Sequence, residues 1–213
     1  MYHILCFGDS NTYGFIAGAG GRYDESIRWT RLLQKNLGED YYVIEEGLNG
    51  RSTVFEDPYK KFLKGIDLLE VSIASHNPID LVILMLGTND VKADFKTGPK
   101  EIRDGLECLI KKLRDPMIYN KAVLIVSPIH IRESIVTSVF CESFGGLNGV
   151  ELSKKLAPAF KELAKQYNCD FLDAAEYAVA DDTDAIHLDA KGHAALAAAF
   201  YNKIKEIQND RFK

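Results

Sequence analysis

Cysteine is scarce in this chain, with four among 213 residues, at positions 6, 108, 141 and 169. No two of them form a Cys-x-x-Cys pair, the spacing that many structural zinc sites and dithiol redox sites use. The sequence therefore indicates neither a zinc site nor a redox centre of these kinds.

Strong charge of one sign and long apolar runs are also missing. The formal net charge is only −5, and no basic stripe is present, which argues against nucleic acid and a membrane surface as partners. No segment approaches the length of a membrane span. The first residues lack the charged, apolar and small-residue regions of a signal peptide, so we expect a cytoplasmic protein.

Apolar residues, in contrast, are plentiful and make up 46% of the sequence. A chain of this length and composition can bury a full hydrophobic core and falls within the usual size of one domain. No internal repeat, low-complexity tract or linker divides it. We therefore expect a single domain over residues 1–213.

Short apolar runs without helical periodicity alternate with amphipathic stretches, and these runs predict strands. Strands that alternate with helices imply a parallel sheet, because parallel neighbours need crossover connections, which are usually helical and right-handed. The expected fold is α/β, a three-layer, flavodoxin-like α/β/α arrangement around a five-stranded parallel sheet. The predicted strands run from Tyr2 to Phe7, Tyr41 to Glu45, Leu81 to Leu86, Ala122 to Ser127 and Cys169 to Leu172.

The first predicted strand leads into Gly8-Asp9-Ser10, which places a serine at the mouth of a strand. Near the other end of the chain, Asp184 and His187 have a spacing that can place a carboxylate against an imidazole on one turn. A serine hydroxyl becomes a nucleophile when an imidazole takes its proton, and a carboxylate orients the ring and stabilises its cation. Together these residues predict a serine hydrolase.

Two further polar or flexible positions follow the second and third predicted strands. Gly50 ends Gly-Leu-Asn-Gly, where glycine lets a backbone N–H approach closely, and Asn89 in Gly-Thr-Asn-Asp offers a carboxamide donor. In open α/β sheets, ligands bind beyond the carboxyl ends of the strands, and acyl transfer needs donors aimed at a developing oxyanion. With the Ser10 N–H they form a candidate oxyanion hole, although by position alone both are also ordinary turn residues.

The four blocks Gly8-Asp9-Ser10, Gly50, Gly87-Thr88-Asn89-Asp90 and Asp184-Ala185-Ile186-His187 occur together and in order. In them the chain resembles the SGNH, or GDSL-type, hydrolase superfamily. It is similar to the arylesterase and acyltransferase-like branch in Arg28-Trp29-Thr30 and in the segments 43–51 and 81–90. The similarity spans nearly the whole chain and is weakest over residues 130–149.

The resemblance implies a flavodoxin-like fold with Ser10 as nucleophile, His187 as base and then acid, and Asp184 as the orienting carboxylate. It implies an oxyanion hole built from the N–H groups of Ser10 and Gly50 and the side chain of Asn89. No cofactor or metal would be needed. The expected activity is that of a serine esterase that hydrolyses small short-chain esters, including aryl or acetylated-sugar esters, through an acyl-enzyme, with acyl transfer when another alcohol replaces water.

Aromatic and imidazole side chains near these blocks are candidates for substrate contact. Tyr13 and Phe15 follow the nucleophile, His130 follows the fourth predicted strand, and Phe140 lies in the segment least similar to the family. Small-molecule pockets are often lined by such groups, although aromatic residues at these places also often belong to the core. The sequence leaves the natural ester and the oligomeric state open, and neighbouring subunits of a homo-oligomer could build part of the pocket.

A metal-dependent phosphoesterase is one alternative, with ligands drawn from Asp9, Asn89, Asp90, His130, His187 and His193. Such enzymes generally need an Asp-x-His near the first strand and a His after the central Asn, whereas position 11 is Asn and position 90 is Asp. A non-catalytic carbohydrate-binding module is another alternative. In a protein that has lost activity, we expect another residue type at Ser10, Asp184 or His187, and all three catalytic residue types are present.

Overall fold

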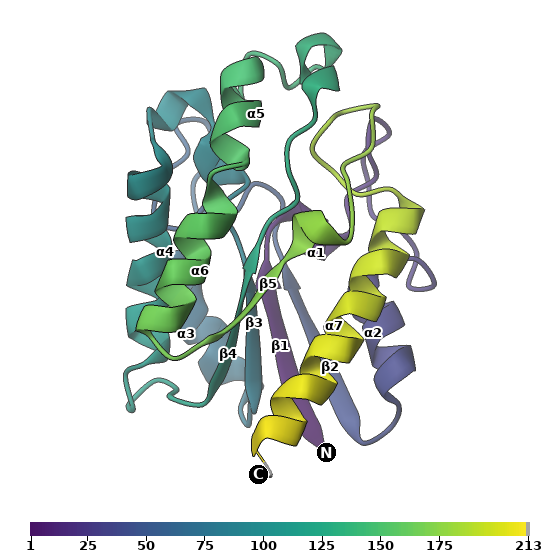
Figure 1. Ribbon diagram of the computed structural model, residues 1–213, viewed down its shortest axis with the longest axis vertical. Helices are drawn as coiled ribbons and strands as arrows, with labels where there is room; N and C mark the ends of the chain where they lie inside the picture. The colour runs from purple at the N-terminus through teal and green to yellow at the C-terminus, as the bar shows by residue number, and fades with distance from the viewer. Residues whose placement is uncertain (212–213) are drawn as a thin grey trace.

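Five parallel strands form one sheet at the centre of the computed structural model, which describes residues 1–211 (Figure 1). The strand order is β2-β1-β3-β4-β5, and every neighbouring pair is parallel. The predicted α/β fold with a five-stranded parallel sheet is confirmed. The strands are β1 (Tyr2–Gly8), β2 (Tyr41–Gly47), β3 (Leu81–Met85), β4 (Ala122–Ser127) and β5 (Asp170–Asp173).

Helices cover both faces of the sheet and complete the three layers (Figure 1). One face carries α2 (Trp29–Leu37) and α7 (Ala190–Arg211). The other carries α3 (Gly65–His76), α4 (Pro99–Leu113) and α6 (Leu156–Gln166). The connections hold α1 (Ser10–Tyr13), α5 (Leu147–Ser153) and the 3₁₀-helices η1 (Asn89–Val91), η2 (Ala93–Phe95), η3 (Glu133–Thr137) and η4 (Ala174–Glu176).

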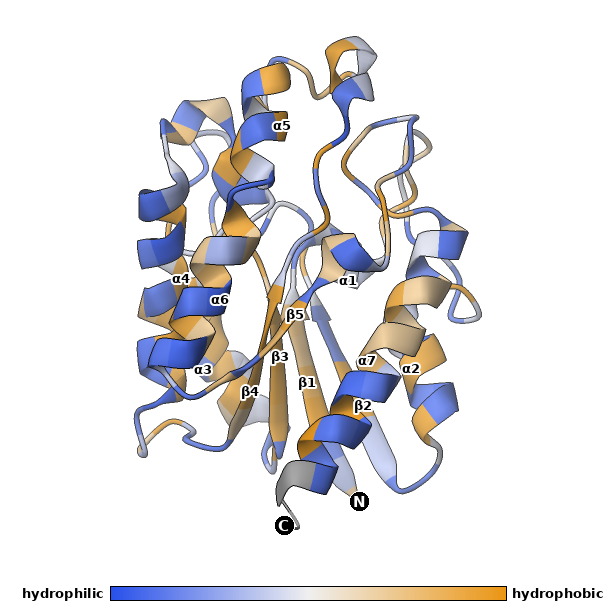
Figure 2. Ribbon diagram, in the orientation of Figure 1, coloured by the Kyte–Doolittle hydropathy of each residue, from blue (hydrophilic) through white to orange (hydrophobic). Residues whose placement is uncertain are grey.

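Burial explains why β3 and β4 are nearly continuous apolar runs. Both are inner strands covered by helices on each face, and all of their residues are buried (Figure 2). Parallel strands covered on both faces need apolar side chains on both faces, so they do not show the alternation of a half-exposed strand. This pattern made the inner strands predictable to within one residue.

The edge strand β2 runs two residues beyond its predicted end at Glu45, to Gly47. In the structure, Glu45 is half-buried and accepts hydrogen bonds from Arg28 at 2.9 and 3.0 Å, so a charged residue is accommodated within the strand. Polar side chains at a sheet edge do not by themselves end a strand.

Small side chains at the start of α7 let this helix pack closely on α2. Ala197 and Phe200 are buried, and the Phe200 ring lies against the Trp29 indole with 4.5 Å between centroids. This contact anchors the helix that follows the segment carrying Asp184 and His187. No helix in the described part of the chain combines the length and apolar character needed to cross a membrane.

The strand order reverses at β1, because β2 lies on one side of it and β3 on the other. Ligands in such sheets bind at this switch point, beyond the carboxyl ends of the strands. Ser10 follows β1, Gly50 follows β2 and Asn89 follows β3. The fold therefore brings all three residues to the carboxyl ends of the strands, at the end of the sheet opposite the chain's N-terminus (Figure 1).

Candidate active site

Ser10 stands where β1 ends and α1 begins. Asp9 caps this short helix, since its Oδ1 accepts a hydrogen bond from the Asn11 N–H at 2.9 Å. A capping carboxylate satisfies a backbone donor that the start of a helix otherwise leaves unpaired. Gly8 is required before it, because a Cβ there would lie 2.1 Å from Thr12 Oγ1. The local sequence thus fixes a tight turn that presents the serine hydroxyl.

His187 connects the serine to the carboxylate. Its Nε2 lies 2.8 Å from Ser10 Oγ, and its Nδ1 lies 2.7 Å from Asp184 Oδ2. Asp184 Oδ1 accepts hydrogen bonds from the backbone N–H groups of Ile186 and His187, at 3.1 and 3.0 Å. The three predicted catalytic side chains therefore form one continuous hydrogen-bonded chain.

Asp184 is buried, and burial acts to raise its pKa. The hydrogen bonds and charge of His187, with the backbone N–H groups, outweigh burial, and the pKa of Asp184 lies below its ordinary value. Asp184 is therefore a carboxylate near neutral pH. A carboxylate at Nδ1 holds the ring proton there and leaves Nε2 free to accept the serine proton.

Asn11 joins the nucleophile turn to the histidine loop. Its Oδ1 accepts from the Leu188 N–H at 3.0 Å, and its Nδ2 donates to the Ile186 carbonyl at 3.2 Å. Its own carbonyl accepts from Trp29 Nε1 at 3.1 Å. One side chain next to the serine thus binds the backbone on both sides of His187, a connection that sequence reasoning did not identify.

Gly50 and Asn89 line the same cavity as Ser10. Gly50 has a φ of +84°, in the left-handed region that favours glycine, and a Cβ there would lie 3.1 Å from the Leu63 side chain. Asn89 Nδ2 donates one hydrogen bond to the Arg51 carbonyl at 3.2 Å. An amide nitrogen has two donors, so this bond orients the carboxamide and leaves the second N–H for a ligand.

Asp90 ties the loop after β2 to the 3₁₀-helix that begins at Asn89. Its Oδ1 accepts from the Thr53 N–H at 2.9 Å and also from the Thr53 hydroxyl. The side chain is fully buried, and burial raises the pKa of Asp90 to about 6. This contact holds the Gly50 segment against Asn89 and so fixes the two candidate donors relative to each other.

Arg51 has a structural role and is not part of the cavity lining. Its guanidinium donates to the carbonyls of Gly8, at 3.0 Å, and Glu46, and lies 4.0 Å from the centroid of the Phe7 ring. It is 3% exposed and does not line the catalytic cavity. Arg51 therefore joins the ends of β1 and β2 beneath the site.

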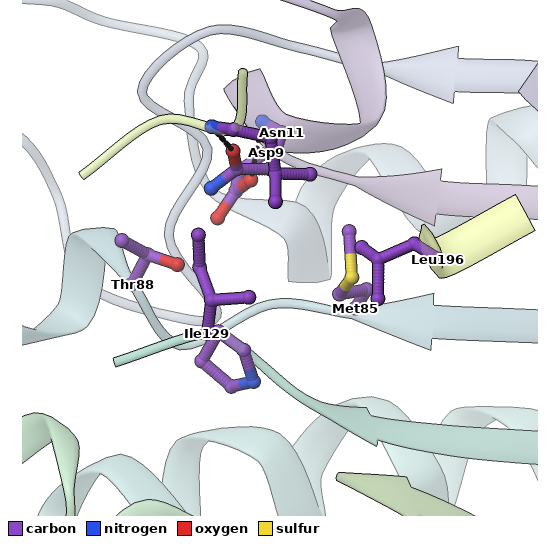
Figure 3. A pocket seen from close by; sticks show the side chains of 8 residues that line it. Asp9, Asn11, Met85, Thr88, Ile129 and Leu196 are labelled. Atoms are coloured by element: carbon purple, nitrogen blue, oxygen red, sulfur yellow. Dashed lines mark hydrogen bonds between the residues drawn. The ribbon is translucent and has the colours of Figure 1, made fainter. Parts of the chain in front are cut away.

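Asp9 faces a small gap beside the nucleophile turn (Figure 3). Asn11, Met85, Thr88 and Ile129 also border this gap, which has no room for a water molecule. Burial raises the pKa of Asp9, against the opposing effects of the Asn11 N–H and the Thr88 hydroxyl. The gap is a dry part of the core and is separate from the catalytic cavity.

The catalytic cavity has a volume of about 350 Å³. Aromatic rings form the wall next to the histidine, because the ring centroids of Phe15 and Phe140 lie 4.5 and 6.0 Å from that of His187. Phe144 lines the cavity too and packs edge-on against Phe140. Two of the four candidate substrate-binding residues thus lie on the cavity, and their contact with substrate stays a prediction.

The other two candidates, Tyr13 and His130, do not line this cavity. The Tyr13 carbonyl accepts from Arg22, whose guanidinium lies 4.7 Å from the centroid of the Tyr13 ring, so the ring packs against Arg22. His130 lies between Ile129 and Ile131, both buried in the core. His130 itself is partly buried and does not reach the cavity lining.

Sequence reasoning also missed one side of the cavity. Residues 48–64 form a long connection between β2 and α3 with no regular element, and this loop contributes Asp57, Tyr59, Lys60 and Leu63 to the lining. Lys92, after η1, adds another charged side chain. Long irregular loops in compact domains are usually functional, so the length of this connection was the available signal.

The ligand set imagined for a phosphoesterase does not come together. His187 is bound to Asp184 and Ser10, and the Nδ1 of His193 instead accepts from the Trp29 N–H at 3.3 Å, inside the core. Within residues 1–211 no three His, Cys, Asp or Glu side chains are grouped as metal ligands. The chemistry of these side chains fits a nucleophilic relay.

Comparison with known proteins shows which family the chain is similar to. Residues 6–195 match the model of the GDSL-like lipase/acylhydrolase family. The chain is 27% identical over 216 aligned residues to an acetylxylan esterase of Xylanibacter ruminicola, and the match covers 95% of this chain but 43% of that protein. The chain thus spans less than half the length of this curated relative.

Solved structures match over almost the whole chain. A native aryl esterase of M. smegmatis superposes with a TM-score of 0.89 at 34% identity, over 97% of this chain and 99% of that one. A carbohydrate acetylesterase of Sinorhizobium meliloti superposes with a TM-score of 0.87 at 35% identity, over 97% and 100% of the two chains. The chain therefore belongs to the GDSL-like lipase/acylhydrolase, or SGNH, family, the carboxylic ester hydrolases that its four sequence blocks predicted.

Proposed function

We propose that this protein is a serine esterase that hydrolyses small short-chain esters through an acyl-enzyme. The observation that carries the proposal is the hydrogen-bonded chain from Ser10 through His187 to Asp184, with links of 2.8 and 2.7 Å. Ser10 and His187 line a cavity that Gly50 and Asn89 also line. These are the parts that acyl transfer needs: nucleophile, base, orienting carboxylate and oxyanion donors.

In the first step, Ser10 Oγ attacks the ester carbonyl carbon while its proton passes to His187 Nε2. The carbonyl electron pair moves to the oxygen, and the N–H groups of Ser10 and Gly50 and the Asn89 carboxamide stabilise this oxyanion. Asp184 stabilises the imidazolium without taking its proton. The intermediate then expels the alcohol, which leaves with the proton from His187 Nε2.

In the second step, water enters beside His187 and loses its proton to Nε2 as its oxygen attacks the acyl-enzyme. Collapse of the second intermediate releases the acid, and the proton returns to Ser10 Oγ. An alcohol that enters in place of water gives a new ester by the same path. The protein thus acts as an acyltransferase whenever an alcohol competes with water.

The size and lining of the cavity support a small substrate. A volume of about 350 Å³ suits a short acyl group together with a small alcohol, and the aromatic wall beside His187 suits an aryl or sugar ring. The names of the similar proteins, an aryl esterase and two acetylesterases, point in the same direction. Small esters are the proposed partners, and assembly into a homo-oligomer stays a prediction.

Release of nitrophenol from nitrophenyl esters of increasing acyl length tests this proposal. Wild type and Ser10→Ala are compared, each with and without a chelator. We expect activity that is highest with short acyl groups, unchanged by the chelator and lost in Ser10→Ala. Activity that disappears with the chelator, or that remains in Ser10→Ala, would instead reopen the metal-dependent phosphoesterase. No activity in wild type would favour a binding module.

A further inference from the structure

The lining of the catalytic cavity contains both aromatic and charged side chains. The side next to His187 is aromatic, with Phe15 and Phe140 against the imidazole. The charged part of the lining, here called the charged side, comes from the two segments that also supply the oxyanion donors: the loop after Gly50 and the turn after Asn89. The charged residues on that side are Asp57, Lys60 and Lys92.

Both oxygens of the carboxylate on this side already have hydrogen-bond partners. Asp57 is 7% exposed, and its Oδ2 accepts from Lys92 Nζ at 2.7 Å. Its Oδ1 accepts from the backbone N–H groups of Tyr59 and Lys60, at 2.9 and 3.0 Å. Burial acts to raise the pKa of Asp57, but the Lys92 ammonium and the backbone donors outweigh it and keep the pKa below its ordinary value. Asp57 is therefore ionised and balances Lys92.

Lys60 is left as the unbalanced charge. Its side chain is exposed and lines the cavity, and no acidic side chain of the described residues forms an ion pair with its ammonium. Lys92 keeps two further N–H donors beside the one directed at Asp57. The charged side of the cavity thus carries a net positive charge and surplus donors, although the whole chain has a net charge of −5.

The catalytic geometry decides which part of an ester meets this side. The leaving oxygen must take its proton from His187 Nε2, so the alcohol part lies along the aromatic wall beside that ring. The carbonyl oxygen points to Gly50 and Asn89. In the proposed orientation, the acyl chain extends toward Lys60 and Lys92, which line the cavity and offer donors.

We propose that this site selects acyl groups that end in a carboxylate, such as half-esters of short dicarboxylic acids, through the ammonium groups of Lys60 and Lys92. This inference rests on the proposed esterase function and adds the chemical class of the acyl group. Opposite charges across a site contribute chiefly to specificity and to the association rate. The effect is therefore expected in kcat/KM and is expected to weaken as salt is added.

The test compares two matched pairs of phenyl esters. Phenyl hydrogen glutarate and phenyl valerate differ by a carboxylate at the acyl end, whereas 4-acetoxybenzoate and phenyl acetate differ by a carboxylate on the alcohol. The readout is the ratio of kcat/KM within each pair, after subtraction of uncatalysed hydrolysis, because a ratio cancels any general loss of activity. The variants are Lys60→Gln, Asp57→Asn and, as control, Lys61→Gln.

Lys61 is the matched control because it is exposed, adjacent to Lys60 and absent from the cavity lining. We expect Lys60→Gln to lower the glutarate-to-valerate ratio by about 3- to 10-fold at low ionic strength. We expect Asp57→Asn to raise it, because Lys92 then loses its counter-charge. Lys61→Gln should leave both ratios unchanged.

An unchanged glutarate-to-valerate ratio in Lys60→Gln would overturn the inference, and so would an equal fall in Lys61→Gln, which would indicate a general surface field. A fall confined to the 4-acetoxybenzoate pair would overturn the orientation, since the charge would then act on the alcohol. If wild type hydrolyses phenyl acetate but the ratios fail, only this inference fails. If wild type hydrolyses none of the four esters, the proposed function fails with it.

Discussion

The carboxamide of Asn11 holds His187 from both sides, through the Leu188 N–H at 3.0 Å and the Ile186 carbonyl at 3.2 Å. Asn11 directly follows the nucleophile, so the same residue fixes the positions of both partners in the 2.8 Å contact between Ser10 and His187. Ser10 and His187 are 177 positions apart along the chain. Such distant groups need a rigid connection if their contact is to be kept during turnover.

Replacement of Asn11 should therefore reduce catalysis more than binding. In Asn11→Ala both bonds are lost, and in Asn11→Asp only the acceptor for Leu188 is kept. We expect kcat to fall about 10- to 100-fold in Asn11→Ala and less in Asn11→Asp, with KM changed less than threefold, because small misplacement of catalytic groups is costly. Steady-state kinetics and thermal unfolding of both variants check this, and a lower melting temperature with unchanged kcat would show that Asn11 is only structural.

The Asn89 side chain should stabilise the transition state and not the bound substrate. Loss of one oxyanion donor typically costs about 10²- to 10³-fold in kcat, and we expect this range for Asn89→Ala with nitrophenyl acetate. Asn89→Asp should be at least as impaired, because a carboxylate repels the oxyanion. Equal activity of wild type and Asn89→Ala, measured at saturating substrate, would show that the donor lies elsewhere.

The burial of His193 should make the free energy of unfolding fall in acid. Burial lowers its pKa to about 4, whereas the ordinary value is 6.5, so the unfolded chain binds the proton more readily. This contribution is fully present above pH 6.5 and is lost as pH falls toward 4. Between pH 7 and pH 5 the free energy of unfolding of wild type should fall by about 1–2 kcal/mol more than that of His193→Asn.

The Asn side chain is chosen because it retains an acceptor for the Trp29 N–H. Urea unfolding at the two pH values measures the difference. A parallel pH dependence in wild type and His193→Asn would mean that the buried imidazole does not titrate as its surroundings require.

The burial of Asp90 should change the free energy of unfolding in the opposite direction over a similar pH range. Its pKa is about 6 in the folded protein, above the ordinary 3.8, so the folded state binds the proton more readily. This contribution is present below pH 3.8 and is lost as pH rises through 6. Between pH 4 and pH 6.5, the unfolding free energy of wild type relative to Asp90→Asn should decline by about 2 kcal/mol. A relative rise in the same titration would contradict the burial argument.

The fold was predictable because its signals are local. The inner strands are continuous apolar runs bounded by turns, and a strand covered on both faces must be apolar on both. The closeness of the first three catalytic blocks also follows from the fold, because the carboxyl ends of parallel strands lie along the same end of the sheet. The positions of Ser10, Gly50 and Asn89 at that edge needed no knowledge of tertiary contacts.

The absence of Tyr13 and His130 from the cavity lining could not be read from position alone. Tyr13 instead packs against Arg22, and His130 lies between two buried isoleucines. The charged side of the cavity was equally hidden, because residues 48–64 have no periodic pattern. The place of Lys60 depends on the turn that Asp57 stabilises through backbone N–H groups. Side-chain direction in irregular segments comes from tertiary contacts and not from sequence spacing.

The most direct measurement is the mass of the protein after reaction with diethyl 4-nitrophenyl phosphate, which phosphorylates an activated serine. We expect loss of esterase activity in step with one diethylphosphoryl group per chain, carried by the peptide that contains Ser10. The adduct should be absent in Ser10→Ala and form far more slowly in His187→Ala. Modification of another residue, or full esterase activity in Ser10→Ala, would contradict Ser10 as the nucleophile.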